Sequence, residues 1–160
     1  MSIEKNNFKN ITLLQKAFSD EIGKASFIVP NGHGMNASLL DNSHAPYGST
    51  TIEVETTTLD SFNTKFDFIK IDAEGGERKI WDGAQKYLEK YPETLILLEW
   101  RYDRYDDPEK FAEEIFKKCI ITYVDFEGME NPVQSPEQLY TVKNADWMLV
   151  LRVKNEKGLL

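Results

Sequence analysis

Apolar and polar positions alternate along this chain with two different periods, and the change of period is sharpest between residues 66 and 91. The run 66–71 is apolar on both faces, which is typical of a parallel strand buried between helices. Gly75 and Gly76 then permit a sharp turn. After the turn, apolar side chains recur on one helical stripe, which consists of Ile80, Trp81, Ala84, Tyr87, Leu88 and Tyr91. The pattern therefore predicts a strand, a turn and a helix.

The rest of the chain continues this alternation of elements. Further strands are predicted at 11–18, 24–29, 51–56, 94–100, 120–124 and 147–153. Asp107 followed by Pro108 is a favoured helix start and predicts a second helix. We expect a single domain over residues 1–160, of the α/β class, with a mostly parallel sheet and antiparallel additions.

Two of these segments, 24–29 and 51–56, could pair as an antiparallel ribbon. The stretch 30–50 between them is rich in Gly, Asn and Ser and holds both histidines, His33 and His44. Long irregular loops are usually functional or disordered, so we expect a flap that faces the substrate. A glycine pattern at 32–37 fits a dinucleotide fingerprint, but a cluster of breaker residues replaces the helix that such a motif needs.

The composition limits the classes of partner that this chain is expected to bind. The formal net charge is −8, which opposes phosphate backbones, so we expect no nucleic-acid partner. No apolar run approaches the roughly 20 residues that span a bilayer, and no signal-peptide core is evident, so we expect no membrane partner. Cys119 is the single cysteine, which fits a reducing compartment. Together these features predict a cytoplasmic location.

Candidate chemistry gathers where the strands end. Asp72 and Glu74 follow the strand at 66–71, and Glu99 lies near the end of the strand at 94–100. Ligands bind outside the carboxyl ends of strands in open α/β sheets, so these carboxylates are candidate site residues. The alternative is that Asp72 and Glu74 only cap the helix that follows.

The same stretch carries a compound motif. It consists of Thr-Leu-Asp at 58–60, Phe-Ile-Lys-Ile-Asp-Ala-Glu-Gly-Gly-Glu at 68–77, and an apolar strand ending in Glu at 95–99. This combination resembles the FkbM family of S-adenosylmethionine-dependent methyltransferases, and the resemblance runs from about residue 6 to about residue 153. It implies a Rossmann-like methyltransferase sheet, of which this chain would form the C-terminal part.

The resemblance also implies a function and a cofactor. The family O-methylates a hydroxyl group of a small molecule, a sugar or a polyketide-like scaffold, with S-adenosylmethionine as the methyl donor. Ser19 and Asp20 would contact the adenine side of the cofactor, and Asp72 would lie beside its methionine part. The plain alternative for Ser19 and Asp20 is an ordinary polar turn.

In that frame the remaining candidates surround the methyl acceptor. Glu74 would face the acceptor as base or orienter, and His33 is a second candidate base because histidine titrates near neutrality. Glu99 would not contact the ligands directly but would support the residues that do. Trp100, with Tyr102 and Tyr105, could line an acceptor wall, although ordinary packing at a strand end is the alternative.

In one respect this sequence differs from the pattern of the FkbM family. A glycine-rich cofactor-binding segment is expected before the strand at 11–18, and nothing upstream of Ile11 matches it. This leaves open a non-catalytic fragment, or half of a split enzyme whose sheet is completed by self-association or by a partner chain. A further alternative is a Mg²⁺ enzyme that uses Asp72, Glu74, Glu99 and Asp103.

Overall fold

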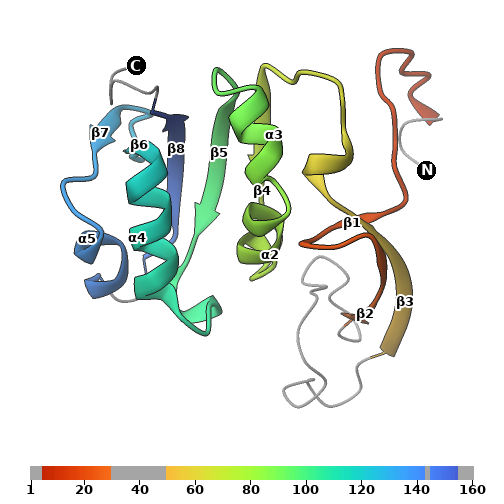
Figure 1. Cartoon of the computed structure of the whole chain (residues 1–160), viewed down its shortest axis with the longest axis horizontal. Coiled ribbons are helices and arrows are strands. Elements are labelled where there is room, and N and C mark those ends of the chain that lie inside the picture. Colours follow the sequence, from red (N-terminus) through yellow and green to blue (C-terminus); the bar gives the residue numbers. More distant parts are fainter. Residues whose placement is uncertain (1–4, 30–49, 143–144, 155–160) are drawn as a thin grey trace.

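A computed structural model describes residues 5–29, 50–142 and 145–154. The described chain contains two β-sheets with helices packed on one face of the larger one (Figure 1). Residues 30–49 lie outside the described part, and with them the expected flap, His33 and His44.

The larger sheet has five strands in the order β4-β5-β8-β6-β7. Their bounds are β4 Phe68–Ile71, β5 Leu95–Trp100, β8 Trp147–Val153, β6 Cys119–Val124 and β7 Glu130–Pro132. β4 pairs with β5 in parallel, whereas β8 is antiparallel to both β5 and β6, and β7 is antiparallel to β6. Thus β4, β5 and β6 run in the same direction, but the expected mostly parallel pairing is not confirmed. The reason is that β8, late in the chain, inserts between β5 and β6.

The register divides the sheet into a covered face and an open face. Ile96, Leu98 and Trp100 of β5 are almost fully buried on the covered face. The helices there are α2 Glu77–Asp82, α3 Gln85–Lys90 and α4 Pro108–Lys118, while the short α5 Glu137–Thr141 packs against α4 (Figure 1). This face holds the main apolar core of the described chain.

The open face is less covered than the sequence predicts. Phe68 of β4 is 53% exposed, and Lys70 on the same face is also exposed. Their partners in register, Leu95 and Leu97, are only half-buried. Within the described chain, β4 is therefore not buried on both faces, because the helices that follow it all pack on one side.

The single helix predicted over 77–91 is interrupted, giving α2 and α3. The break falls at Gly83, where a Cβ atom would overlap the carbonyl oxygen of Ser19 and lie 3.0 Å from its carbonyl carbon. The short 3₁₀ helix η3, Leu59–Ser61, then supplies Asp60, whose Oδ1 accepts a hydrogen bond from the N–H of Tyr87 at 2.8 Å. Asp60 therefore caps α3 from a neighbouring segment.

The smaller sheet has the order β1-β3-β2, with β1 Ala17–Phe18, β3 Thr50–Thr57 and β2 Gly23–Val29. β2 and β3 form the predicted antiparallel ribbon, in which Phe27 pairs with Ile52. The strand predicted over 11–18 is reduced to β1, since residues 11–15 form no strand.

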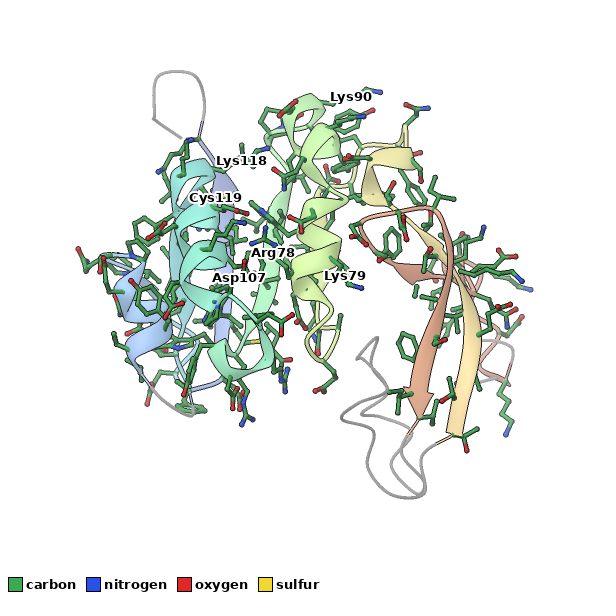
Figure 2. All side chains as sticks on the ribbon, turned by 60° about the horizontal axis from the view of Figure 1, so that its bottom comes forward. Arg78, Lys79, Lys90, Asp107, Lys118 and Cys119 are labelled. Carbon is green, nitrogen blue, oxygen red and sulfur yellow. The ribbon has the colours of Figure 1, made fainter. Side chains whose placement is uncertain are left out.

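The covered face is also held by contacts between helices. Arg78 of α2 forms an ion pair with Glu114 of α4 at 2.9 Å, and Figure 2 shows Arg78 between these helices. Cys119 directly follows α4 and is only 1% exposed, and burial raises the pKa of its thiol to about 12 (Figure 2). Among the described residues, no helix is long and apolar enough to cross a membrane.

Candidate active site at the ends of two parallel strands

The loop after β4 is organised by one buried carboxylate, that of Glu77. Glu77 is 0% exposed, and its two oxygens accept hydrogen bonds from the N–H groups of Ala73 at 2.7 Å and Gly75 at 2.9 Å. The hydroxyl of Tyr105 donates a longer bond of 3.4 Å to the same carboxylate. A buried charge needs such partners, and here they fix the path of the loop.

Two residues of this loop have left-handed backbone conformations. Glu74 has φ of 50° and Gly75 has φ of 99°. Glycine adopts this region freely, whereas glutamate does so at a cost in free energy. Such strained non-glycine residues cluster at functional sites, which makes Glu74 a candidate on backbone evidence alone.

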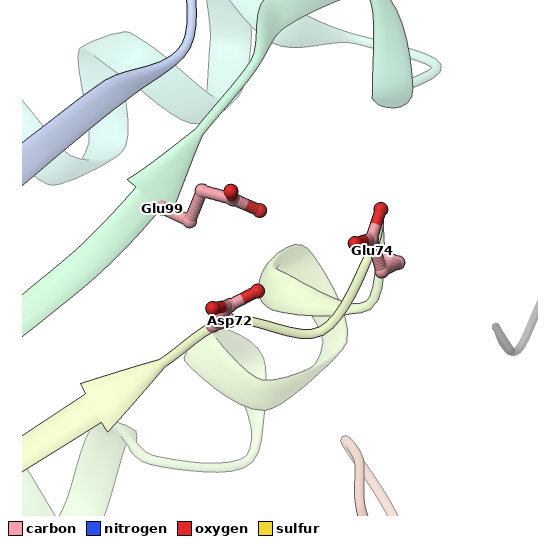
Figure 3. A group of neighbouring side chains, drawn as sticks. All are labelled: Asp72, Glu74 and Glu99. Carbon is pink, nitrogen blue, oxygen red and sulfur yellow. The ribbon is translucent and has the colours of Figure 1, made fainter. Parts of the chain in front are cut away.

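Three carboxylates converge at this end of the sheet. Asp72 follows β4, Glu74 lies in the loop and Glu99 comes from β5, and Figure 3 shows their carboxylates turned toward one another. One oxygen from each lies within 4.8 Å of the others. Because β4 and β5 are parallel neighbours, their carboxyl ends meet, and the convergence expected from the sequence follows.

Two cations balance this carboxylate group. Lys70 contacts Asp72 at 2.7 Å. Arg104, at the end of the 3₁₀ helix η4 (Tyr102–Arg104), contacts Glu99 at 2.6 Å and Glu74 at 3.0 Å. The sequence analysis did not predict Arg104 as a site residue. Several acidic and basic residues surround it in the sequence, so no pattern distinguished it. Its contacts with Glu74 and Glu99 depend on the fold of η4.

The surroundings of Asp72 and Glu99 shift the pKa values of these two carboxyls in opposite directions. The hydrogen bond from Lys70 is the main reason that the pKa of Asp72 is lowered. Burial is the main reason that the pKa of Glu99 is raised; Arg104 opposes this shift, and the charges of Asp72 and Glu74 add to it. A pair of carboxyls with diverging pKa values is a feature of acid-base sites.

A cavity of about 570 Å³ is lined by Asp72 and Glu74 of this group but not by Glu99. Ile69, Lys70, Ile71 and the loop after them line one side, and the smaller sheet lines the other with Ala17, Phe18 and Phe27. Leu59 and Ile80 complete its apolar lining. This volume lies within the range of small-molecule sites, and apolar walls with a few convergent polar groups are typical of them.

Comparison with known proteins agrees with this arrangement. The family model described as the methyltransferase FkbM domain matches residues 3–119. The chain belongs to this FkbM family. The match confirms the resemblance drawn from the motif between residues 57 and 100, and it identifies the chain as a methyltransferase domain. No match was found among curated proteins or among solved structures.

Other residues predicted for an FkbM site lie away from the carboxylates. Trp100 is fully buried; its ring packs at a tilt against those of Tyr105 and Phe111, and its Nε1 donates to the carbonyl of Leu139 at 2.8 Å. Its place is thus the core of the domain. Asp103 pairs with Arg101 at 2.7 Å and does not join the carboxylate group.

Ser19 and Asp20 lie at the end of β1, opposite Gly83. Ser19 is 4% exposed, its N–H donates to the carbonyl of Thr57 at 2.8 Å, and its hydroxyl donates to Asp20 at 2.8 Å. Neither residue lines the cavity, whereas Phe18, directly before them, does. The backbone of Ser19 instead fixes the smaller sheet to the helical layer.

Proposed function

We propose that this domain transfers a methyl group from S-adenosylmethionine to a hydroxyl of a small molecule or sugar. The observation that carries the proposal is the group Asp72, Glu74 and Glu99 beside the cavity of about 570 Å³, in a chain of the FkbM family. The acceptor class and the O-methylation are taken from the family resemblance.

The cavity suits a cofactor that combines apolar and cationic parts. Phe18 and Phe27 offer flat apolar walls, and Asp72, whose pKa is lowered, stays ionised at neutral pH and can accept hydrogen bonds from an amine or hydroxyl. Asp20, which is exposed and lies two residues after Phe18, remains the proposed contact on the adenine side. When bound, S-adenosylmethionine would supply an electrophilic methyl group.

The remaining groups then position and deprotonate the acceptor. Glu74 is the proposed base, because its strained backbone presents a carboxylate next to Asp72. The hydroxyl proton would pass to Glu74 while the hydroxyl oxygen would bond to the methyl carbon; the bond between that carbon and the sulfonium sulfur would break, and S-adenosylhomocysteine would be the leaving group. Arg104 contacts both Glu74 and Glu99 and would orient the two glutamates. His33 is retained as a second candidate base.

The proposal is tested by calorimetric titration of the whole chain with S-adenosylmethionine and with S-adenosylhomocysteine. We expect saturable binding near one per chain. Asp72→Asn should weaken it by about tenfold or more, since a hydrogen bond to a charged group contributes roughly 1.5–3 kcal/mol. Asp67→Asn is the matched control, because Asp67 is exposed just before β4 and does not line the cavity.

The other outcomes point to the alternatives. Heat with Mg²⁺ alone would favour a carboxylate metal site at Asp72, Glu74 and Glu99, where the cation would compete with Arg104. The absence of a binding signal with S-adenosylmethionine, S-adenosylhomocysteine and Mg²⁺ would contradict cofactor binding by this chain. It would favour a non-catalytic fragment or half of a split enzyme.

A further inference from the structure

Lys70 places a positive charge in a strand that is otherwise apolar. β4 reads Phe-Ile-Lys-Ile, so Lys70 is its one charged residue. Its side chain lines the cavity of about 570 Å³, and its Nζ donates to Oδ2 of Asp72 at 2.7 Å. Asp72 lines the same cavity. Side chains two positions apart along an extended chain point to the same side, so the two residues present an ion pair to the cavity.

This ion pair has hydrogen-bonding capacity left for a ligand. The side chains of Lys70 and Asp72 are 51% and 38% exposed, and ion pairs this exposed contribute little to stability. Their mutual hydrogen bond raises the pKa of Lys70 and lowers the pKa of Asp72, so both stay charged at neutral pH. An ammonium group has three N–H donors, and the bond to Asp72 is the one that Lys70 forms within the described chain. Stability of the fold therefore does not explain a lysine at this position, whereas a charged ligand would use it.

The other donors beside this wall of the cavity are engaged. The N–H groups of Ala73 and Gly75 donate to the carboxylate of Glu77. The N–H group of Gly76 donates to the carbonyl of Ala73 at 3.0 Å. Among the described residues that line the cavity, Lys70 is the single cation. A carboxylate on a ligand in this cavity would therefore find its charged partner at Lys70.

We propose that Lys70 binds the α-carboxylate of S-adenosylmethionine while Asp72 accepts its α-ammonium group, so that the ion pair recognises the amino-acid end of the cofactor. This inference rests on the proposed function. An α-amino acid carries one charge of each sign on groups bonded to the same carbon, which matches the adjacent opposite charges of the pair. Each charged group would then keep an oppositely charged neighbour when the ligand displaces water, so no charge is left unpaired.

The consequence is selectivity between forms of the cofactor. S-adenosylhomocysteine carries both charged groups, its decarboxylated analogue S-adenosyl-3-thiopropylamine lacks only the carboxylate, and 5′-methylthioadenosine lacks both. Calorimetric titration of the whole chain with each ligand measures the selectivity. Wild type should bind S-adenosylhomocysteine at least about tenfold more tightly than the decarboxylated analogue, because charge-assisted hydrogen bonds to the carboxylate are lost with it.

Variants at position 70 assign this selectivity to the lysine. Lys70→Gln should raise the Kd of S-adenosylhomocysteine by at least about tenfold and leave the Kd of 5′-methylthioadenosine unchanged, since that ligand has no charge for Lys70 to contact. Lys70→Arg keeps the positive charge and should retain the preference for the carboxylate. Lys65→Gln is the matched control: Lys65 is also an exposed lysine in an ion pair, with Glu93 at 2.8 Å, but it does not line the cavity. This control should leave all three Kd values unchanged.

The outcomes separate this inference from the proposed function. If S-adenosylhomocysteine binds wild type and Lys70→Gln equally well, the inference is wrong and cofactor binding stands. If Lys70→Gln weakens all three ligands by the same factor, the lysine shapes the cavity and does not read the carboxylate, which also overturns the inference. If none of the three ligands binds wild type, the proposed function fails and the inference fails with it. All of these readouts are binding constants, so none depends on methyl transfer.

Discussion

Glu77 and Glu74 have opposite roles although they are three residues apart in one motif. Glu77 is buried and bonds backbone N–H groups of the loop, whereas Glu74 projects from a strained backbone toward two other carboxylates. The second glutamate of the motif thus holds the backbone of the loop, whereas the first lines the cavity.

Removal of the Glu77 carboxylate should destabilise the domain. Glu77→Ala leaves the N–H groups of Ala73 and Gly75 without partners, so we expect the free energy of unfolding to fall by at least about 2 kcal/mol. Glu77→Gln, which keeps one acceptor, should lose less. Urea unfolding measures both. Glu93→Gln, an exposed glutamate, is the control and should change the midpoint little.

Arg104 should control the pH dependence of this site through Glu99. The folded pKa of Glu99 is raised, so its contribution to stability is present below its usual value of 4.5 and is lost as pH rises through the folded value. Asp72, with a lowered pKa, has the opposite sign: its contribution is present above 3.8 and is lost at lower pH.

Arg104→Gln should raise the pKa of Glu99 further, because the arginine is the cation that opposes the shift. The loss of stability with rising pH would then extend to higher pH than in wild type. Carbon-13 chemical shifts of the carboxyl and urea unfolding from about pH 4 to about pH 8 would measure this. Arg104→Lys keeps the charge, so the pKa of Glu99 in this variant should lie between its values in wild type and in Arg104→Gln. An unchanged pKa of Glu99 in both variants would contradict the assigned contact.

At the scale of elements, the break between α2 and α3 connects the two sheets. Gly83 lets the backbone of Ser19 approach the helical layer, and the carbonyl of Gly83 accepts a hydrogen bond from the N–H of Asp60 at 2.9 Å. The end of β1 and the segment after β3 therefore meet the helices at one point.

Gly83→Ala should weaken this junction. The new methyl group would overlap backbone atoms, which cannot rotate away as a side chain could, so we expect a loss of about 1–3 kcal/mol in thermal or urea unfolding. Gly23→Ala is the matched control, since a Cβ there meets only the hydroxyl of Thr56 at 3.9 Å. A Gly83→Ala variant as stable as wild type would show that the approach of Ser19 is not required.

The sequence predicted elements better than it predicted their connections. The strand at 147–153 and the ribbon of β2 and β3 were predicted from the sequence, and the convergence of Asp72 with Glu99 agrees with their places at neighbouring strand ends. The break at Gly83 was missed because the apolar stripe continues past it. The insertion of β8 and the role of Arg104 were missed because both depend on residues far apart in the sequence.

At the scale of the whole molecule, the two sheets differ in how well they are buried. No residue of β2 or β3 belongs to the main cluster of buried apolar side chains in the described chain, whereas β5 and β8 supply several. The smaller sheet forms one wall of the cavity but has little core of its own.

Native-state hydrogen exchange should therefore separate the two sheets. Amides of β2 and β3 should open with a lower free energy than those of β5 and β8, because fewer buried apolar contacts hold them. Cofactor binding should raise the protection of β2, since Phe27 lines the cavity. Equal protection in both sheets would mean that the molecule opens as one cooperative unit.

Cys119 is a natural probe for local opening of the domain. Its thiol is the single one in the sequence, lies at the junction of α4 and β6, and has a pKa raised to about 12, so an alkylating reagent meets almost no reactive thiolate while the sheet is closed. The rate at which one alkyl group is added per chain then reports how readily the larger sheet opens around Cys119. Mass spectrometry could follow it in any variant without an engineered label.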